Sequence, residues 1–124
     1  DVDSRHNYFY PLRIRPGGRT VALSEYGGIA WPMPGHEPPG KTYGYGTAKD
    51  KADLTKRYKM LQWKTILPQL GRGLSALVYT QLTDVEDEVN GLFTYDRAAL
   101  KPEAAAVRSC NAALAAEFAK VTAK

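Results

Sequence analysis

Two short, nearly apolar segments flank a helical pattern, and this order constrains the fold more than any other feature of the sequence. Residues 20–24 (TVALS) and 74–80 (LSALVYT) are short apolar runs next to glycines, a pattern that predicts buried strands. Two parallel strands need a crossover of a dozen or more residues, which is usually a helix. The order therefore predicts an α/β fold built on a parallel βαβ unit, with helices covering a sheet.

The crossover is predicted to be a helix over residues 50–70. Leu54, Tyr58 and Leu61 recur at the spacing of one helical face. Acidic residues lie near the start, where the helix dipole stabilises negative charge. Glycines follow at the predicted end. Pro68 is unfavourable inside a helix, so the last turn is expected to be kinked or irregular.

The rest of the chain gives weaker patterns. Residues 1–18, which carry prolines and a glycine pair, are expected to form a loop. Residues 92–95 are expected to be a short extended piece. An alanine-rich helix is expected over residues 102–120, with Pro102 at its tolerated first position. Cys110 is expected to be a small buried or half-buried side chain of this helix, whose buried side is predicted to carry Val107, Leu114, Phe118 and Val121.

The composition excludes several classes of function. The chain has 124 residues, suited to one domain, and a net charge of +4 whose positive residues alternate with acids. It therefore lacks a basic stripe, and no nucleic-acid partner is predicted. No apolar run approaches the ~20 residues that a membrane span needs. His6 and His36 are isolated, so no metal site is predicted. No cofactor is predicted either.

Residues 35–42 (GHEPPGKT) match the phosphate-loop pattern G-x-x-x-x-G-K-[ST]. A phosphate loop follows a buried strand, offers consecutive backbone N–H groups and continues into a helix. Here two prolines precede the pattern, Pro38 and Pro39 lie inside it without N–H groups, and glycines follow it. A chance match is therefore favoured over nucleotide binding. Residues 27–47 are instead predicted to be a long binding loop or lid.

Polar residues follow both predicted strands. Glu25 comes directly after the first, and Thr80 and Gln81, preceded by Tyr79, end the second. Ligands of parallel α/β folds bind at the carboxyl ends of the strands, so these residues are expected to share one rim. From the residues alone, Glu25 could also cap a helix or pair with an arginine.

Three motifs resemble a known family. Residues 23–28 (LSEYGG), 41–46 (KTYGYG) and 84–91 (DVEDEVNG) look like the last part of the catalytic (β/α)₈ barrel of glycoside hydrolase family 2, in particular its β-galactosidase-like members. The resemblance covers most of the chain. It implies that residues 1–124 are a single partial domain, the C-terminal portion of a TIM barrel with about strands seven and eight and their helices. The chain, which begins with Asp1, is accordingly expected to be a piece of a longer protein.

The resemblance also implies a function, the retaining hydrolysis of a carbohydrate β-glycoside. Glu25 occupies the position of the nucleophile, whereas the acid/base would lie in a segment before Asp1. Retaining enzymes need both carboxyl groups, about 5–5.5 Å apart. The isolated chain is therefore expected to be inactive and to associate with itself or with the rest of its barrel. The alternative is a non-catalytic carbohydrate-binding fragment.

Other site residues follow from the resemblance with alternatives left open. Tyr8 falls where the family has a tyrosine that hydrogen-bonds the nucleophile, although Tyr10 or His6 could match instead, or Tyr8 could pack on the rim. Trp31 could stack on a sugar or pack the long loop. Related enzymes carry a tryptophan near the end of the second strand, where this sequence has Thr80 and Gln81. Thr80 and Gln81 are therefore candidate substrate contacts, and this difference leaves the sugar specificity open.

The remaining aromatic and acidic residues of the two loops are given structural roles. For Tyr43 and Tyr45, packing is favoured over sugar stacking. The acidic loop, residues 84–88, lacks the pattern of a calcium loop and is expected to be solvated or to border the rim.

Overall fold

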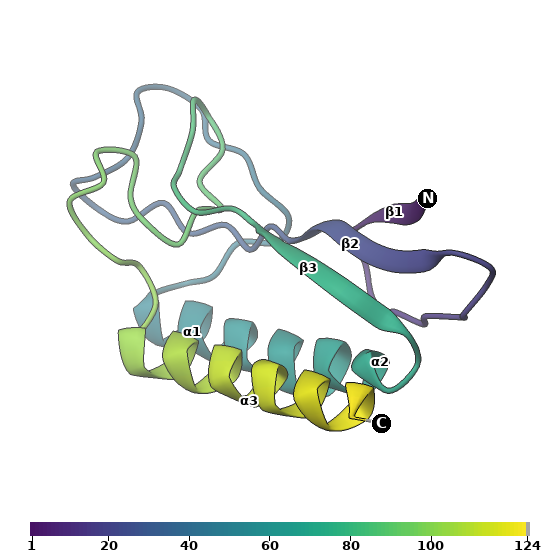
Figure 1. Cartoon of the computed structure of the whole chain (residues 1–124). Helices are drawn as coiled ribbons and strands as arrows, with labels where there is room; N and C mark the ends of the chain where they lie inside the picture. Colours follow the sequence, from purple (N-terminus) through teal and green to yellow (C-terminus); the bar gives the residue numbers. More distant parts are fainter. Residues whose placement is uncertain (124) are drawn as a thin grey trace.

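The chain forms a three-stranded parallel sheet with helices on one of its faces (Figure 1). The structure is a computed structural model, and it describes residues 1–123. Its strand order is β1-β2-β3, which confirms the predicted parallel βαβ unit. The elements are β1 (Val2–Asn7), β2 (Thr20–Gly27), α1 (Lys51–Met60), the π-helix η1 (Leu61–Ile66), α2 (Leu67–Leu70), β3 (Leu74–Thr80) and α3 (Ala104–Thr122).

Strand β1 was not predicted, because residues 1–18 were expected to be a loop. Its sequence, VDSRHN, is polar and shows no buried position, so periodicity gives no sign of a strand. Pairing with β2 supplies its backbone hydrogen bonds, in a register that starts with Val2 opposite Thr20. The prediction of two strands is thus corrected to three, and residues 1–123 form an open sheet rather than a closed barrel.

The helical crossover spans the predicted residues 50–70 as α1, η1 and α2. Asp50 caps it, because its Oδ1 accepts the Asp53 N–H at 2.8 Å while Asp53 Oδ2 accepts the Lys49 N–H at 3.0 Å. Pro68 has no N–H, and the wider π turn of η1 ends at Ile66, two residues before it. The predicted irregularity at Pro68 is confirmed, but it affects the preceding turns rather than the last one.

The main core lies between the sheet and the helices. It also contains two polar side chains with partners. Gln62 is buried and exchanges hydrogen bonds with the Tyr26 hydroxyl at 3.1–3.2 Å. Gln69 Oε1 accepts the Ile14 N–H at 2.9 Å, which fixes the segment between β1 and β2. The buried apolar residues of this core are Ile14, Val21, Leu23, Tyr26, Leu61, Ile66, Leu70 and Leu74.

Strand β3 was predicted to be buried, and this is correct on one face only. Leu74 belongs to the core, whereas Val78 is 58% exposed. The helices cover one face of the sheet, and β3 is an edge strand (Figure 1). Its apolar sequence therefore leaves an uncovered apolar surface in the part of the chain that the structure describes.

Helix α3 lies beside α1 on the same face of the sheet (Figure 1). Cys110 is buried, as expected, but Phe118 and Val121 of the predicted buried side are each 39% exposed. They lie near the end of the helix, where the packing surface runs out. The predicted extended piece at residues 92–95 forms only isolated bridges around Phe93, and no strand.

Two long loops, residues 28–50 and 81–103, gather at the carboxyl edge of the sheet (Figure 1). They are joined by backbone hydrogen bonds, among them Trp31 N–H to Val89 O at 2.9 Å and Val89 N–H to Tyr43 O at 2.9 Å. The predicted long loop is thus confirmed. It is held against its neighbour and lies over the end of β2.

Candidate active site

Glu25 lies at a β-bulge near the end of β2. The register with β1 passes from Arg5 opposite Leu23 to His6 opposite Glu25, which leaves Ser24 unpaired. Leu23 and Tyr26 both face the core. The two residues between them, Ser24 and Glu25, therefore turn away from the helices, where strict alternation would have sent one of them inward. The bulge thus directs the Glu25 carboxylate to the rim.

Tyr8 and His6, from the end of β1, contact this carboxylate. The Tyr8 hydroxyl donates a hydrogen bond to Glu25 Oε2 at 2.5 Å, and His6 Nδ1 lies 3.4 Å from the same oxygen. The structure thus places Tyr8, and not Tyr10, on Glu25. Within residues 1–123, Glu25 Oε1 accepts no hydrogen bond, and the side chain is 42% exposed. One carboxylate oxygen is therefore held while the other remains open to a ligand.

Tyr8 is held as a neutral donor. Burial, followed by the hydrogen bond to Glu25, raises the pKa of Tyr8 to about 12, and a contact with the Thr80 hydroxyl acts in the opposite direction. At neutral pH the phenol is protonated. The phenol therefore donates to the carboxylate oxygen and does not compete with it for a proton.

An aromatic wall supports Tyr8. Its ring stacks on Tyr45 with centroids 4.0 Å apart and an interplanar angle of 7°, and Tyr43 meets Tyr45 edge-on at 5.6 Å. The stack needs Gly28, since a Cβ there would lie 2.7 Å from the Tyr45 ring and 2.8 Å from the Tyr8 ring. Tyr45 therefore packs on Tyr8, as expected. Tyr43 is half exposed and remains accessible.

Thr80 ends β3 and Gln81 follows it, on the same rim. The Gly28 N–H donates to Thr80 O at 2.9 Å, so the two strand ends are joined next to Glu25. Gln81 Nε2 donates to Asn90 Oδ1 at 2.7 Å and to Glu88 Oε2 at 3.1 Å. Glu88 was expected only to be solvated or to border the rim, and Asn90 was not singled out. Periodicity could not find them, because they lie on a loop that only the tertiary fold returns to Gln81.

Two residues predicted near the site lie in cores instead. Trp31 is only 8% exposed and packs with Ala48 and Leu54 in a second hydrophobic cluster, which favours packing over sugar stacking. Tyr79 does not share the rim with Thr80. Its ring packs edge-on against Tyr26 and Tyr58 at 5.5 and 5.2 Å on the helix side of the sheet.

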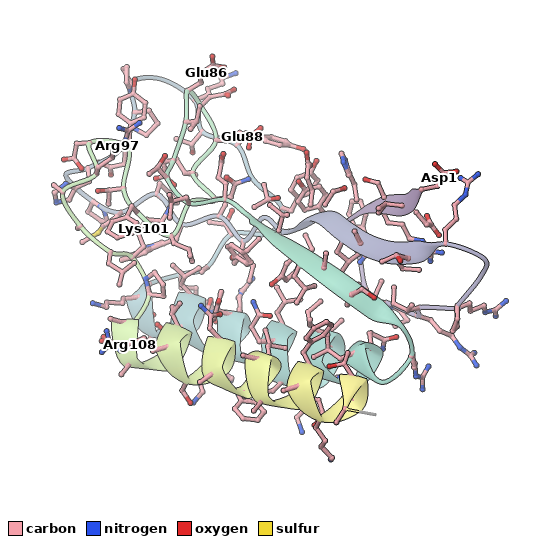
Figure 2. The ribbon with its side chains drawn as sticks, viewed as in Figure 1. Asp1, Glu86, Glu88, Arg97, Lys101 and Arg108 are labelled. Atoms are coloured by element: carbon pink, nitrogen blue, oxygen red, sulfur yellow. The ribbon has the colours of Figure 1, made fainter. Side chains whose placement is uncertain are left out.

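The acidic loop is not uniformly solvated, and the prediction is wrong for its first residue. Asp84 is buried, and its Oδ1 accepts hydrogen bonds from Lys101 Nζ at 2.7 Å and from the Gly91 N–H at 2.8 Å. Lys101 also donates to Val89 O at 2.8 Å and has no exposed surface. Figure 2 shows Lys101 inside the loop layer, which consists of the two long loops at residues 28–50 and 81–103, whereas Glu86 stands at the tip of the second loop.

The phosphate-loop pattern lacks the structure that would give it a function. Residues 31–34 form no strand, and no helix begins until Lys51. A hydrogen bond of 2.7 Å between His36 Nδ1 and Asp96 Oδ2 holds this segment against the second loop. This agrees with a chance match.

No group of three or more His, Cys, Asp or Glu side chains is arranged to hold a metal ion in residues 1–123. Over the same range, none of the helices is both long enough and apolar enough to cross a membrane. The site thus consists of one partly exposed carboxylate with a phenol donor, an aromatic wall and an amide-rich rim. Such an arrangement can attack or stabilise an electrophilic carbon and accept hydrogen bonds from hydroxyl groups.

Comparison with models of known protein families gave no match for this chain, and comparison with curated protein sequences gave none either.

Proposed function

We propose that this chain is part of a retaining glycoside hydrolase and that Glu25 is its nucleophile. The observation that carries the proposal is the hydrogen bond of 2.5 Å from Tyr8 to one oxygen of Glu25, at the carboxyl edge of a parallel sheet. A glycosidase nucleophile has to remain ionised and fixed in orientation while one oxygen attacks the anomeric carbon. The Tyr8 phenol supplies that orientation and leaves Oε1 open.

The finer fold proposed is the C-terminal sector of a (β/α)₈ barrel. In such a barrel, catalytic residues lie at the carboxyl ends of several strands. Here Tyr8 follows β1, Glu25 lies near the end of β2, and Thr80 ends β3. In this frame the uncovered face of the sheet, which includes Val78, would face the barrel interior, and a strand from a segment before Asp1 would supply the acid/base.

The proposal is tested on the protein at its full natural length with activated 2-deoxy-2-fluoro-β-glycosides of the gluco, galacto and manno series. These sugars slow hydrolysis of the glycosyl-enzyme, so the nucleophile stays esterified and its peptide can be identified by mass spectrometry. We expect the label on Glu25. A label on any other carboxylate would assign the nucleophile elsewhere.

Substitution gives the matching control. Glu25→Ala should abolish turnover of aryl β-glycosides while the substrate still binds, because the carboxylate acts mainly in the chemical step. Azide should restore part of the turnover of this variant and invert the configuration at the anomeric carbon. Glu86→Ala, an exposed acid on the neighbouring loop, should leave turnover unchanged. Sugar binding with no Glu25-dependent hydrolysis would instead indicate a non-catalytic carbohydrate-binding protein.

A further inference from the structure

A second carboxylate of the rim, Glu88, is held in a fixed orientation by two amides. Its Oε2 accepts hydrogen bonds from Gln81 Nε2 and Asn90 Nδ2, both at 3.1 Å. Gln81 also donates to Asn90 at 2.7 Å, so the two amides orient each other. Within residues 1–123, Glu88 Oε1 accepts no hydrogen bond. Glu88 is only partly buried, and one of its oxygens is therefore available to a ligand.

The aromatic wall connects Glu88 with Glu25. The backbones of Tyr43 and Glu88 form a parallel bridge between the two loops. The Tyr43 ring contacts Tyr45, which stacks on Tyr8. Tyr8 in turn donates to Glu25. Both carboxylates also act on Tyr45, whose pKa is raised first by its hydrogen bond with Tyr43 and, among smaller causes, by the charges of Glu88 and Glu25. The two acids thus border one rim, with tyrosine rings between them.

The rim around Glu88 carries several acidic side chains. Glu88 and Glu25 are both acidic, and Asp87 stands next to Glu88. Lys101 of the second long loop is fully buried and directed to Asp84 and Val89, so it offers no charge to the rim. A sugar carboxylate would therefore meet like charges, which is unfavourable, whereas neutral hydroxyl groups would find charged acceptors.

We propose that Glu88, held by Gln81 and Asn90, binds hydroxyl groups of an uncharged pyranoside whose anomeric carbon lies at Glu25, and that it disfavours uronides. This inference rests on the proposed function and adds a specificity-determining residue and a substrate class to it. Hydroxyl groups donating to a carboxylate form charge-assisted hydrogen bonds, whose loss weakens binding by on the order of 10- to 100-fold. Glu88→Gln keeps the shape and removes the charge.

The test uses the full-length enzyme and two pairs of 4-nitrophenyl substrates, β-glucoside with β-glucuronide and β-galactoside with β-galacturonide. Wild-type enzyme should turn over the neutral member of its preferred pair at least 100-fold faster. Glu88→Gln should lower kcat/KM for that neutral sugar by about 10- to 100-fold and raise the relative use of the uronide. A merely structural role would lower both members equally. Glu86→Gln, with the same charge change in the same loop, is the control and should change neither.

The two proposals fail in different ways. If Glu25 is labelled but Glu88→Gln behaves like Glu86→Gln, the proposed function stands and the role of Glu88 is wrong. If no glycoside labels Glu25, both are wrong. Should Glu88→Gln fail to fold, as judged by circular dichroism, monodeoxy analogues of the neutral substrate replace it. Removal of one hydroxyl should then cost the wild-type enzyme about 10- to 100-fold, and tolerance of every monodeoxy analogue would overturn the inference.

Discussion

The buried ion pair between Lys101 and Asp84 offers a sharp test of what holds the loop layer together. Its side chains are 0% and 1% exposed, and Lys101 Nζ donates to both Asp84 Oδ1 and Val89 O. Burial raises the pKa of Asp84 and lowers that of Lys101, while their hydrogen bond opposes both shifts. The pair is therefore tolerated because each charge has its partner, and removing one partner should cost far more than the pair contributes.

Lys101→Met keeps most of the side-chain volume and removes the charge. It leaves Asp84 with the Gly91 N–H as its remaining donor and leaves Val89 O without its lysine. Breaking a buried pair in this way costs about 3–5 kcal/mol of unfolding free energy. For a domain of this length, that corresponds to a fall in Tm on the order of 10–20 °C. Urea unfolding followed by circular dichroism measures the change.

The double variant tests the mechanism. Lys101→Met with Asp84→Asn has no buried charge, and the asparagine oxygen still accepts the Gly91 N–H. It should therefore be more stable than Lys101→Met alone and should restore folding if the single variant is unfolded. Lys51→Met, which removes an exposed pair with Glu103 at 3.4 Å, should change stability by less than about 1 kcal/mol. A Lys101→Met loss below 1 kcal/mol, or a double variant less stable than the single, would refute the reasoning.

Four further predictions concern the isolated chain, the tyrosine stack at Gly28, the pH dependence of stability and self-association. If the proposed function is right and the acid/base lies outside these 124 residues, the chain alone should show no glycosidase turnover, because an acid/base typically contributes about 10²–10⁴-fold. Glu25-dependent release of 4-nitrophenol would contradict this. Gly28→Ala should lose on the order of 1–3 kcal/mol in urea unfolding, since φ is +65° there and the new Cβ meets Tyr45 and Tyr8; unchanged stability would show that the stack can move. Stability should fall as pH rises from 10 to 12, because the folded pKa of Tyr8, about 12, lies above the unfolded value of 10.0 and the unfolded state loses its proton first. Tyr8→Phe should reduce this slope in part, since burial also raises the pKa of Tyr10 to about 12. The chain should self-associate through its open strand edges and its exposed face at Val78, so a sharply melting monomer at high micromolar concentration in analytical ultracentrifugation would show a self-sufficient domain.

Local patterns determined the regular elements that have a strong period or cap. The strand at Val21 and Leu23, the helix capped by Asp50 and the disturbance at Pro68 could all be predicted, because each depends on neighbours within a few residues. The position of Glu25 after an apolar strand was visible for the same reason. Its placement near Tyr8 could be proposed only through the resemblance, since nothing local joins residues 17 apart in the sequence.

The tertiary structure decided the rest, because the information lies in pairings between distant segments. Strand β1 is polar and exists through its register with β2, and the bulge at Ser24 that turns Glu25 to the rim is a property of that register. Lys101 and Asp84 are ordinary surface residue types until the loop folds over both of them. Composition favours exposure for charged side chains, and only a pairing that satisfies both charges reverses it.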